Sequence, residues 1–100
     1  MQNEQKLHFA LNMHGASKED EQTEATALLK EFFDNGSLVQ AVGLWNGTTE
    51  TSYIFTVITK NDRERDKTKI KCMYFSERVR SLYKQECLFY TEHKIKAEYI

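Results

Sequence analysis

The sequence contains no proline and only four glycines, and it has no repeat, low-complexity tract or linker-like change of composition. Nothing therefore marks a boundary between two domains. A length of 100 residues is close to the common size of a unit with one hydrophobic core, and 40% of the residues are hydrophobic, which is enough to build that core. We expect residues 1–100 to form a single domain that folds without disulfides.

Cysteine and histidine are also scarce, and their spacing fits no metal site. Cys72 and Cys87 belong to no Cys-x-x-Cys or Cys/His pattern, so in a reducing compartment they are interpreted as small buried apolar residues. His8, His14 and His93 have no acid or cysteine at the spacing of a ligand set. The glycine motifs that bind nucleotide phosphates are absent as well. We expect neither a metal nor a cofactor.

Neither sign of charge dominates, because 14 basic residues face 15 acidic ones and the formal net charge is -1. This balance gives no electrostatic support for a nucleic-acid partner or an anionic membrane. No apolar run approaches the ~18 residues of a membrane span, and the start "MQNEQKLHF" lacks the basic-then-apolar order of a signal peptide. We expect a cytoplasmic protein that binds neither membrane nor nucleic acid.

Apolar periodicity in the first third of the chain predicts a strand followed by a helix. Alternation over 7–13 predicts the first strand, whose residues on one side are Leu7, Phe9, Leu11 and Met13. Ser17 then opens an acidic first turn, which favours a helix N-terminus. Apolar residues at helical spacing extend this helix over 17–35, and Gly36 is interpreted as its left-handed cap.

The middle of the chain predicts a β-hairpin. The runs "LVQAVGLW" at 38–45 and "TSYIFTVIT" at 51–59 are rich in β-branched and aromatic residues. Between them lies Asn46-Gly47, which is the strongest short signal for a hairpin turn. The highly charged stretch 61–71 is interpreted as a loop or as the solvated first turn of a helix.

The last third of the chain predicts a second helix followed by one or two strands. An apolar stripe predicts a helix over 66–84, with inward residues Cys72, Phe75, Val79, Leu82 and Tyr83. Residues 86–92 and 95–100 are strand-like and form either one long strand or two. The order strand, helix, strand, strand, helix, strand predicts an α+β, ferredoxin-like βαββαβ fold with a four-stranded antiparallel sheet.

That fold places both helices on one face of the sheet. We expect the third strand beside the first and the last strand beside the second. The other face would carry aromatic and aliphatic residues without helices to cover them, which favours self-association through the sheet. RNA-recognition domains share this topology, but their basic, aromatic-rich motifs are missing here.

Two polar features are candidates for function. Glu50 stands at the start of the third strand between Trp45 and Tyr53, and Gln85 stands where the second helix leads into the last strand. The Asn-Gly pair is sufficient to form the hairpin turn, so the turn does not require Glu50. A carboxylate near aromatic rings suits a cationic ligand. The alternative is that Glu50 is a solvated turn residue and Gln85 an ordinary polar residue at a helix end.

Taken together, the segments "GLW", "TETSYIFTV", "YKQECLFY" and "KAEYI" resemble the bacteriophage S-adenosylmethionine (SAM) lyases, long called SAM hydrolases. Members of that family have a Gly-x-aromatic segment, a turn, a Glu, a strand, a helix followed by Gln-acid-Cys, and a closing apolar strand. The resemblance runs from Gly43 onward. Trp45 stands where the family has a tyrosine, and 61–69 resembles an insertion.

The resemblance implies a homotrimer with active sites between subunits. It implies that Glu50 is the catalytic residue that holds the substrate ammonium, with Trp45, Tyr53 and Gln85 as substrate-binding residues. The substrate carboxylate would attack its own γ-carbon, giving methylthioadenosine and homoserine lactone. Such an enzyme would counter host methylation or restriction in the host cytoplasm, and it needs few catalytic groups because orientation supplies much of the rate.

Two other classes of function remain open. The chain can be a non-catalytic small oligomeric phage protein that sequesters a nucleotide-like signal or blocks a host defence protein. It can also be a structural or regulatory protein–protein module. Turnover of SAM separates the lyase from both, and binding without turnover separates the second from the third.

Overall fold

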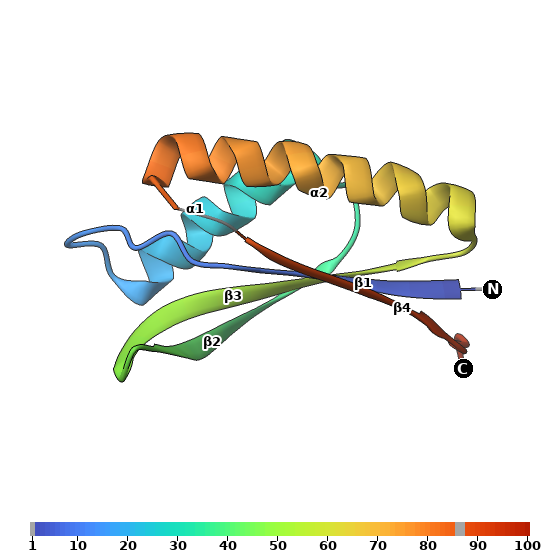
Figure 1. Cartoon of the computed structure of the whole chain (residues 1–100), viewed down its shortest axis with the longest axis horizontal. Coiled ribbons are helices and arrows are strands. Elements are labelled where there is room, and N and C mark those ends of the chain that lie inside the picture. Colours follow the sequence, from blue (N-terminus) through green and yellow to red (C-terminus); the bar gives the residue numbers. More distant parts are fainter. Residues whose placement is uncertain (1, 86–87) are drawn as a thin grey trace.

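The computed structural model describes residues 2–85 and 88–100, and its elements follow the predicted order (Figure 1). They are β1 (Gln2–Phe9), α1 (Lys18–Lys30), β2 (Ser37–Trp45), β3 (Thr48–Thr59), α2 (Asp62–Tyr83) and β4 (Phe89–Ile95). The strands form one antiparallel sheet, and Figure 1 shows both helices on the same face of it. The predicted α+β, ferredoxin-like fold is confirmed. In the described ranges no helix is long and apolar enough to cross a bilayer.

The strands lie in the order β2-β3-β1-β4. The predicted pairing of the third strand with the first is confirmed, but the predicted neighbour of the last strand is wrong. β4 pairs with β1 at the edge opposite β2. The reason is that α2 packs over β1 and β3, so a right-handed crossover from β3 delivers β4 parallel to β3, one strand away.

β1 begins and ends earlier than the predicted strand over 7–13. The residues predicted to share one side of this strand do face the core, because Leu7, Phe9 and Leu11 are all buried. Leu11 lies beyond the end of the strand. Toward its start the strand turns two polar side chains, Asn3 and Gln5, to the same buried side. An apolar alternation could not reveal these positions, because their burial depends on hydrogen bonds.

The start of α1 was predicted correctly. Ser17 is the N-cap, and its Oγ accepts a hydrogen bond of 3.0 Å from the backbone N–H of Asp20. The acidic first turn follows as expected, and it favours the positive end of the helix dipole.

The end of α1 was predicted wrongly. The helix stops at Lys30, so Gly36 lies several residues beyond it and caps nothing. Phe33 leaves the helix to pack on Phe55, with ring centroids 4.9 Å apart. Gly36 has φ +150°, and a Cβ there would overlap the ring of Phe55. Glycine is therefore needed to let the chain pass this ring into β2.

The hairpin was predicted correctly. Asn46 and Gly47 are its two turn residues, with φ of 49° and 76°. Positive φ at both positions is typical of the type I′ turn that suits twisted antiparallel strands. Glu50 lies two residues inside β3 rather than at its start, because the strand already begins at Thr48.

α2 is longer than predicted and contains most of the charged stretch 61–71. Asn61 caps it, and its Oδ1 accepts a hydrogen bond of 2.9 Å from the N–H of Glu64. The predicted inward residues Cys72, Phe75 and Val79 are buried, whereas Leu82 is exposed. The prediction for Leu82 was wrong because Tyr83 is the residue of the last turn that packs against the core, and its neighbour Leu82 lies about 100° away around the helix.

The end of the chain forms one strand. β4 covers Phe89–Ile95, and residues 96–100 lie outside any strand. The N–H of Ala97 donates to Oε1 of Gln2 at 2.9 Å, which holds the chain against β1 just past the sheet. In the described residues one strand runs through His93 and Lys94 without a turn, but the prediction that 95–100 is strand-like was wrong except at Ile95.

The core lies between the two helices and the sheet, and Phe75 is at its centre. The ring of Phe75 is fully buried, and it contacts Phe9, Phe32 and Phe33 at centroid distances of 5.0, 6.0 and 6.4 Å. Cys72 is a free, buried cysteine, as predicted, and burial raises the pKa of its thiol to about 12. Cys87 lies outside the described residues.

A buried amide joins the sheet to α2. Gln5, 1% exposed, donates from Nε2 to the carbonyl of Arg65 at 3.0 Å and to the hydroxyl of Tyr90 at 2.9 Å. Its Oε1 accepts from the hydroxyl of Thr59 at 2.9 Å. The Tyr90 hydroxyl in turn donates to Glu92 at 2.6 Å. These bonds connect β1, β3, β4 and the first turns of α2.

Replacing Gln5 by Leu should lower the free energy of unfolding by about 2–4 kcal/mol. The substitution keeps the size of the side chain but removes the buried bond from Thr59 and the part-buried bonds to Arg65 and Tyr90. Urea denaturation followed by circular dichroism measures the loss. Gln22→Leu, on the exposed side of α1, is the control and should change stability by less than about 0.5 kcal/mol. Equal losses in the two variants would show that the buried bonds contribute nothing.

Candidate functional site

The β2–β3 hairpin extends beyond the rest of the sheet. Pairing of β1 with β3 ends at Phe9 and Tyr53, so residues 41–52 pair only with one another. We call residues 41–52 the hairpin arm, and Figure 1 shows it reaching away from the helices. A two-stranded ribbon is marginally stable alone in water, so this arm depends on contacts at its faces.

Glu50 lies in the hairpin arm on the sheet face that has no helices, which we call the open face. Its partner across the ladder is Gly43. Because Gly43 has no side chain, the carboxylate arm of Glu50 can lie across the neighbouring strand, and a Cβ at Gly43 would come within 3.4 Å of Glu50 Cγ. Glu50 is half-buried by this arrangement. The missing side chain at Gly43 therefore gives the Glu50 side chain room to lie against β2.

Trp45 lies on the same face as Glu50. It pairs with Thr48, two residues from Glu50 along β3, so the two side chains are diagonal neighbours. Diagonal neighbours on paired strands are within reach of each other when the side chains are long. Trp45 is 72% exposed, so its ring is free to stack on a ligand. The structure therefore brings together two of the four predicted site residues.

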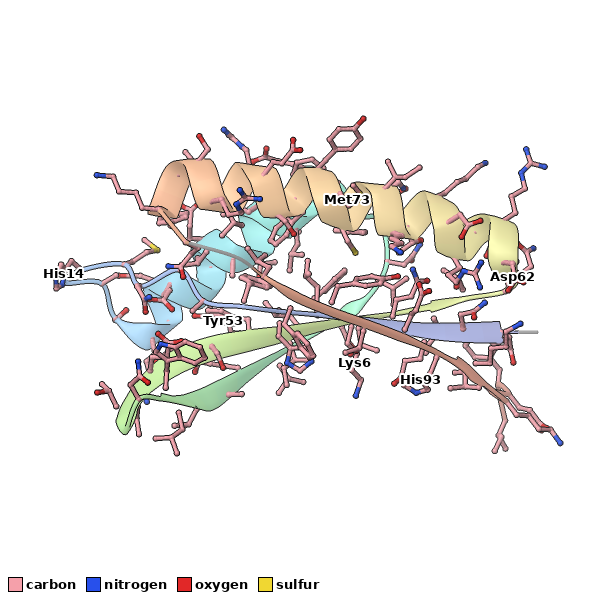
Figure 2. All side chains as sticks on the ribbon, viewed as in Figure 1. Lys6, His14, Tyr53, Asp62, Met73 and His93 are labelled. Carbon is pink, nitrogen blue, oxygen red and sulfur yellow. The ribbon has the colours of Figure 1, made fainter. Side chains whose placement is uncertain are left out.

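Tyr53 lies on the opposite face, beneath the helices (Figure 2). It is fully buried, and its hydroxyl accepts a hydrogen bond of 3.3 Å from Gln40. Burial raises the pKa of Tyr53, and the nearby Glu21 carboxylate raises it further. Because Glu50 and Tyr53 are an odd number of residues apart on one strand, they point to opposite faces. One chain does not bring Tyr53 to Glu50, and its contact with a ligand stays a prediction.

Gln85 follows α2, just after Lys84, which adopts the left-handed conformation with φ 54°. It is half-buried, and its Nε2 donates to the carbonyl of Leu11 at 3.5 Å. Leu11 follows β1, so Gln85 lies at the end of the sheet from which the hairpin arm extends. Within the described residues no hydrogen bond joins Gln85 to Glu50. The neighbours Glu86 and Cys87 of the predicted triplet lie outside the described residues.

The open face also carries a cluster of charged side chains that the sequence analysis did not predict to lie together. Glu4 Oε1 lies 3.6 Å from Lys6 Nζ and 3.3 Å from His93 Nε2, and Figure 2 shows Lys6 and His93 pointing away from the helices. The alternation of side chains along β1 could have predicted this cluster from the sequence. Glu4, Lys6 and His8 alternate with the buried residues, so they point to the opposite face. In residues 2–85 and 88–100 no three His, Cys, Asp or Glu side chains gather as a metal site.

The surface of the described residues has several hollows, and one of about 380 Å³ is lined by Gln85 together with Glu77, Arg80 and Ser81. Another of about 630 Å³ lies between α1 and β2 and is lined by Lys18, Thr23 and Gln40 among others. A further hollow of about 270 Å³ lies between α2 and β4. The Glu50 and Trp45 side chains line none of these hollows. They lie on the open face of the hairpin arm.

Solved structures share the fold. A phage SAM lyase in complex with S-methyl-5'-thioadenosine matches with a TM-score of 0.65 and 18% identity, covering 93% of this chain and 81% of that chain. A phage SAM lyase in the apo state matches with a TM-score of 0.56 and 18% identity, covering 98% and 91%. A DUF3240 family protein from Shewanella baltica OS155 matches with a TM-score of 0.55 and 14% identity, covering 98% and 94%.

No protein-family model matches the chain, and no curated protein matches it either. At sequence identities this low, the structural matches show a common fold but not a common activity or ligand. The resemblance to phage SAM lyases that the sequence suggested is thus confirmed in the fold.

The pKa of His8 should lie below 6.5, first because the side chain is partly buried and second because Lys6 repels a positive charge. A lowered pKa in the fold means that the folded state disfavours the proton. His8 therefore contributes stability above pH 6.5, and this stability is lost as the pH falls through the lowered pKa. NMR titration of the imidazole measures the midpoint.

Two variants separate the causes. Phe89→Ala removes the ring whose centroid lies 5.6 Å from that of His8, so it should raise the His8 pKa by uncovering the imidazole. Lys6→Gln should raise it by a smaller amount. A midpoint at or above 6.5 in the unsubstituted protein would contradict the burial of His8.

Proposed function

We propose that the chain is a phage-type SAM lyase, which cleaves SAM to methylthioadenosine and homoserine lactone. The observation that carries this proposal is the pair of Glu50 and Trp45 on the open face, opposite Gly43, in a fold shared with phage SAM lyases. The solved lyase bound to S-methyl-5'-thioadenosine supports a nucleoside thioether as the product. This substrate is cationic at both its ammonium and its sulfonium, and Glu50 supplies the complementary charge.

In this proposal the reaction occurs within the substrate. One oxygen of the substrate carboxylate forms a bond to the γ-carbon, and the carbon–sulfur bond breaks. Its electron pair goes to the sulfonium sulfur, which leaves as the neutral thioether of methylthioadenosine. Since nucleophile and leaving group are both supplied by the substrate, the protein contributes mainly by holding it in a reactive conformation.

The proposed roles follow from the positions of the side chains. Glu50 binds the substrate ammonium by a charge-assisted hydrogen bond. Trp45 offers a ring face to the adenine or to the sulfonium. Gln85 binds the substrate from another copy of the chain, because no contact joins it to Glu50 within the described residues of one copy. Tyr53 is proposed to reach the ligand only if the site rearranges, since its hydroxyl now binds Gln40.

The proposed assembly is a homotrimer, as the resemblance implies. The hairpin arm supports self-association, because Val42 and Leu44 are 75% and 73% exposed on the helix-side face of the arm, and Trp45 is exposed on the open face. A ribbon with apolar side chains on both faces is stabilised when another surface covers it. The biological role proposed is the depletion of SAM in the host cytoplasm, which weakens methylation and SAM-dependent restriction.

One observation favours a second candidate, a non-catalytic protein that sequesters SAM or a nucleotide-like signal. Trp45 can stack on a ligand but has no hydroxyl to donate, whereas the family resemblance places a tyrosine there. If the hydroxyl is needed for turnover, the site binds its ligand without cleaving it. The products of an incubation with SAM distinguish the two candidates.

Glu50→Gln should lower turnover of SAM, or its affinity, by about tenfold or more, because a charge-assisted hydrogen bond contributes roughly 1.5–3 kcal/mol. The change keeps the shape of the side chain and removes only its charge. Methylthioadenosine is measured by chromatography, and affinity by calorimetry. Glu19→Gln on the exposed first turn of α1 is the matched control and should behave like the unsubstituted protein. Unchanged turnover in Glu50→Gln would mean that Glu50 is a solvated strand residue.

The assembly should have three times the 11.8 kDa mass of one chain at micromolar concentration. Val42→Lys places a charge on the hairpin arm and should shift sedimentation toward the monomer, with loss of SAM turnover. Ile70→Lys, at an exposed apolar position of α2 outside the arm, is the control and should leave the mass unchanged. A purely monomeric unsubstituted protein that still turns over SAM would contradict an intersubunit site.

A further inference from the structure

A second hollow, far from Glu50, lies on the helix side of the sheet between α2 and β4. Its volume is about 270 Å³, which is near the lower end of small-molecule sites. The floor is apolar: Leu7 and Cys72 are almost fully buried, and Leu88 is half-buried. Met73 forms part of the rim, and Figure 2 shows its side chain directed from α2 toward the strand layer. Methionine at a rim adapts to ligands of different shape.

The charged groups around this hollow are two cations and one acid, and Ser76 and Tyr90 also line it. Lys69 and Arg80 stand on the same side of α2, three helical turns apart, and both line the hollow. Lys69 lies 5.8 Å from the ring centroid of Tyr90, which keeps its charge at one end of the hollow. One acid, Glu77, also lines the rim.

The charges of Lys69 and Arg80 are not used by the fold in ion pairs. In the part of the chain that the structure describes, no carboxylate lies within 4.0 Å of either side chain, whereas Arg65 pairs with Asp62 and Asp66. Arg78, on another side of α2, pairs with Glu31 at 3.2 Å. A guanidinium beside an apolar hollow, without a carboxylate partner, suits an anion with an apolar body.

We propose that this hollow binds a small amphiphilic anion, an acyl carboxylate whose chain lies on Leu7, Cys72 and Leu88 and whose carboxylate pairs with Arg80. The binding is non-covalent. Cys72 does not react with the ligand, because burial raises the pKa of its thiol to about 12 and leaves almost no thiolate at neutral pH. None of the proposed lyase residues lines this hollow, although Glu77 and Arg80 also line the neighbouring hollow that contains Gln85. The inference goes beyond the proposed lyase function and does not depend on it.

The test is a titration of the full chain with octanoate, followed by backbone NMR. We expect saturable shifts that are confined to Leu7 and its neighbours on β1, to the 69–80 stretch of α2 and to residues 88–90. Octylammonium has the same chain with the opposite charge and should bind at least about tenfold more weakly. Equal binding of the two probes, shifts centred on another face, or no saturation at millimolar octanoate would overturn the proposal.

Substitutions on α2 provide the matched controls. Met73→Asp places a negative charge at the rim and should weaken octanoate by about tenfold, since like charges repel a carboxylate. Tyr74→Asp changes the next residue, which is equally exposed at 58% but does not line the hollow, and should bind octanoate normally. Arg80→Gln should weaken binding and Arg80→Lys should restore part of it. If Tyr74→Asp weakens octanoate as much as Met73→Asp does, the ligand is not in this hollow and the proposal fails.

Discussion

The Gln5 side chain holds the layers of this small fold in register. Its amide reaches the first turns of α2, the hydroxyl of Thr59 on β3 and that of Tyr90 on β4 from a position in the central strand. The aromatic cluster around Phe75 supplies apolar burial, which is not directional. The bonds of Gln5 are directional, so they fix where α2 lies along the sheet. That placement in turn fixes the hollow beside β4 and the end of the sheet at which Gln85 sits.

Local signals in the sequence predicted the elements well where one residue decides the outcome. Ser17 begins α1, and Asn46-Gly47 turns the hairpin, because side-chain caps and positive φ act within a few residues. The order of the strands was predicted only in part. The position of β4 depends on where α2 packs, and this is decided by contacts between residues that are distant in the sequence.

Buried polar residues were the part of the fold that the sequence pattern could not predict. Gln5 looks like a surface residue in a hydropathy pattern, yet it is almost fully buried because its hydrogen bonds are satisfied. For the candidate site, the proximity of Glu50 and Trp45 follows from the hairpin register, which the Asn-Gly turn already determines. Side chains alternate between the two faces along β3, so Glu50 and Tyr53, three residues apart, point to opposite faces. This could have been inferred from the sequence once the strand was assigned.

The central position of β1 has a consequence for how the molecule assembles. β1 is the first strand of the sheet to be synthesised, but its two neighbours, β3 and β4, come from the middle and the end of the chain. Residues as distant as Gln2 and Ile95 must meet for the sheet to close. Sheets dominated by such non-local pairs fold slowly, since closing long loops costs entropy before the pairing compensates for it. β1, an interior strand of the finished sheet, therefore waits longest with unpaired edges, and on the ribosome it is exposed to wrong partners until its late neighbours emerge.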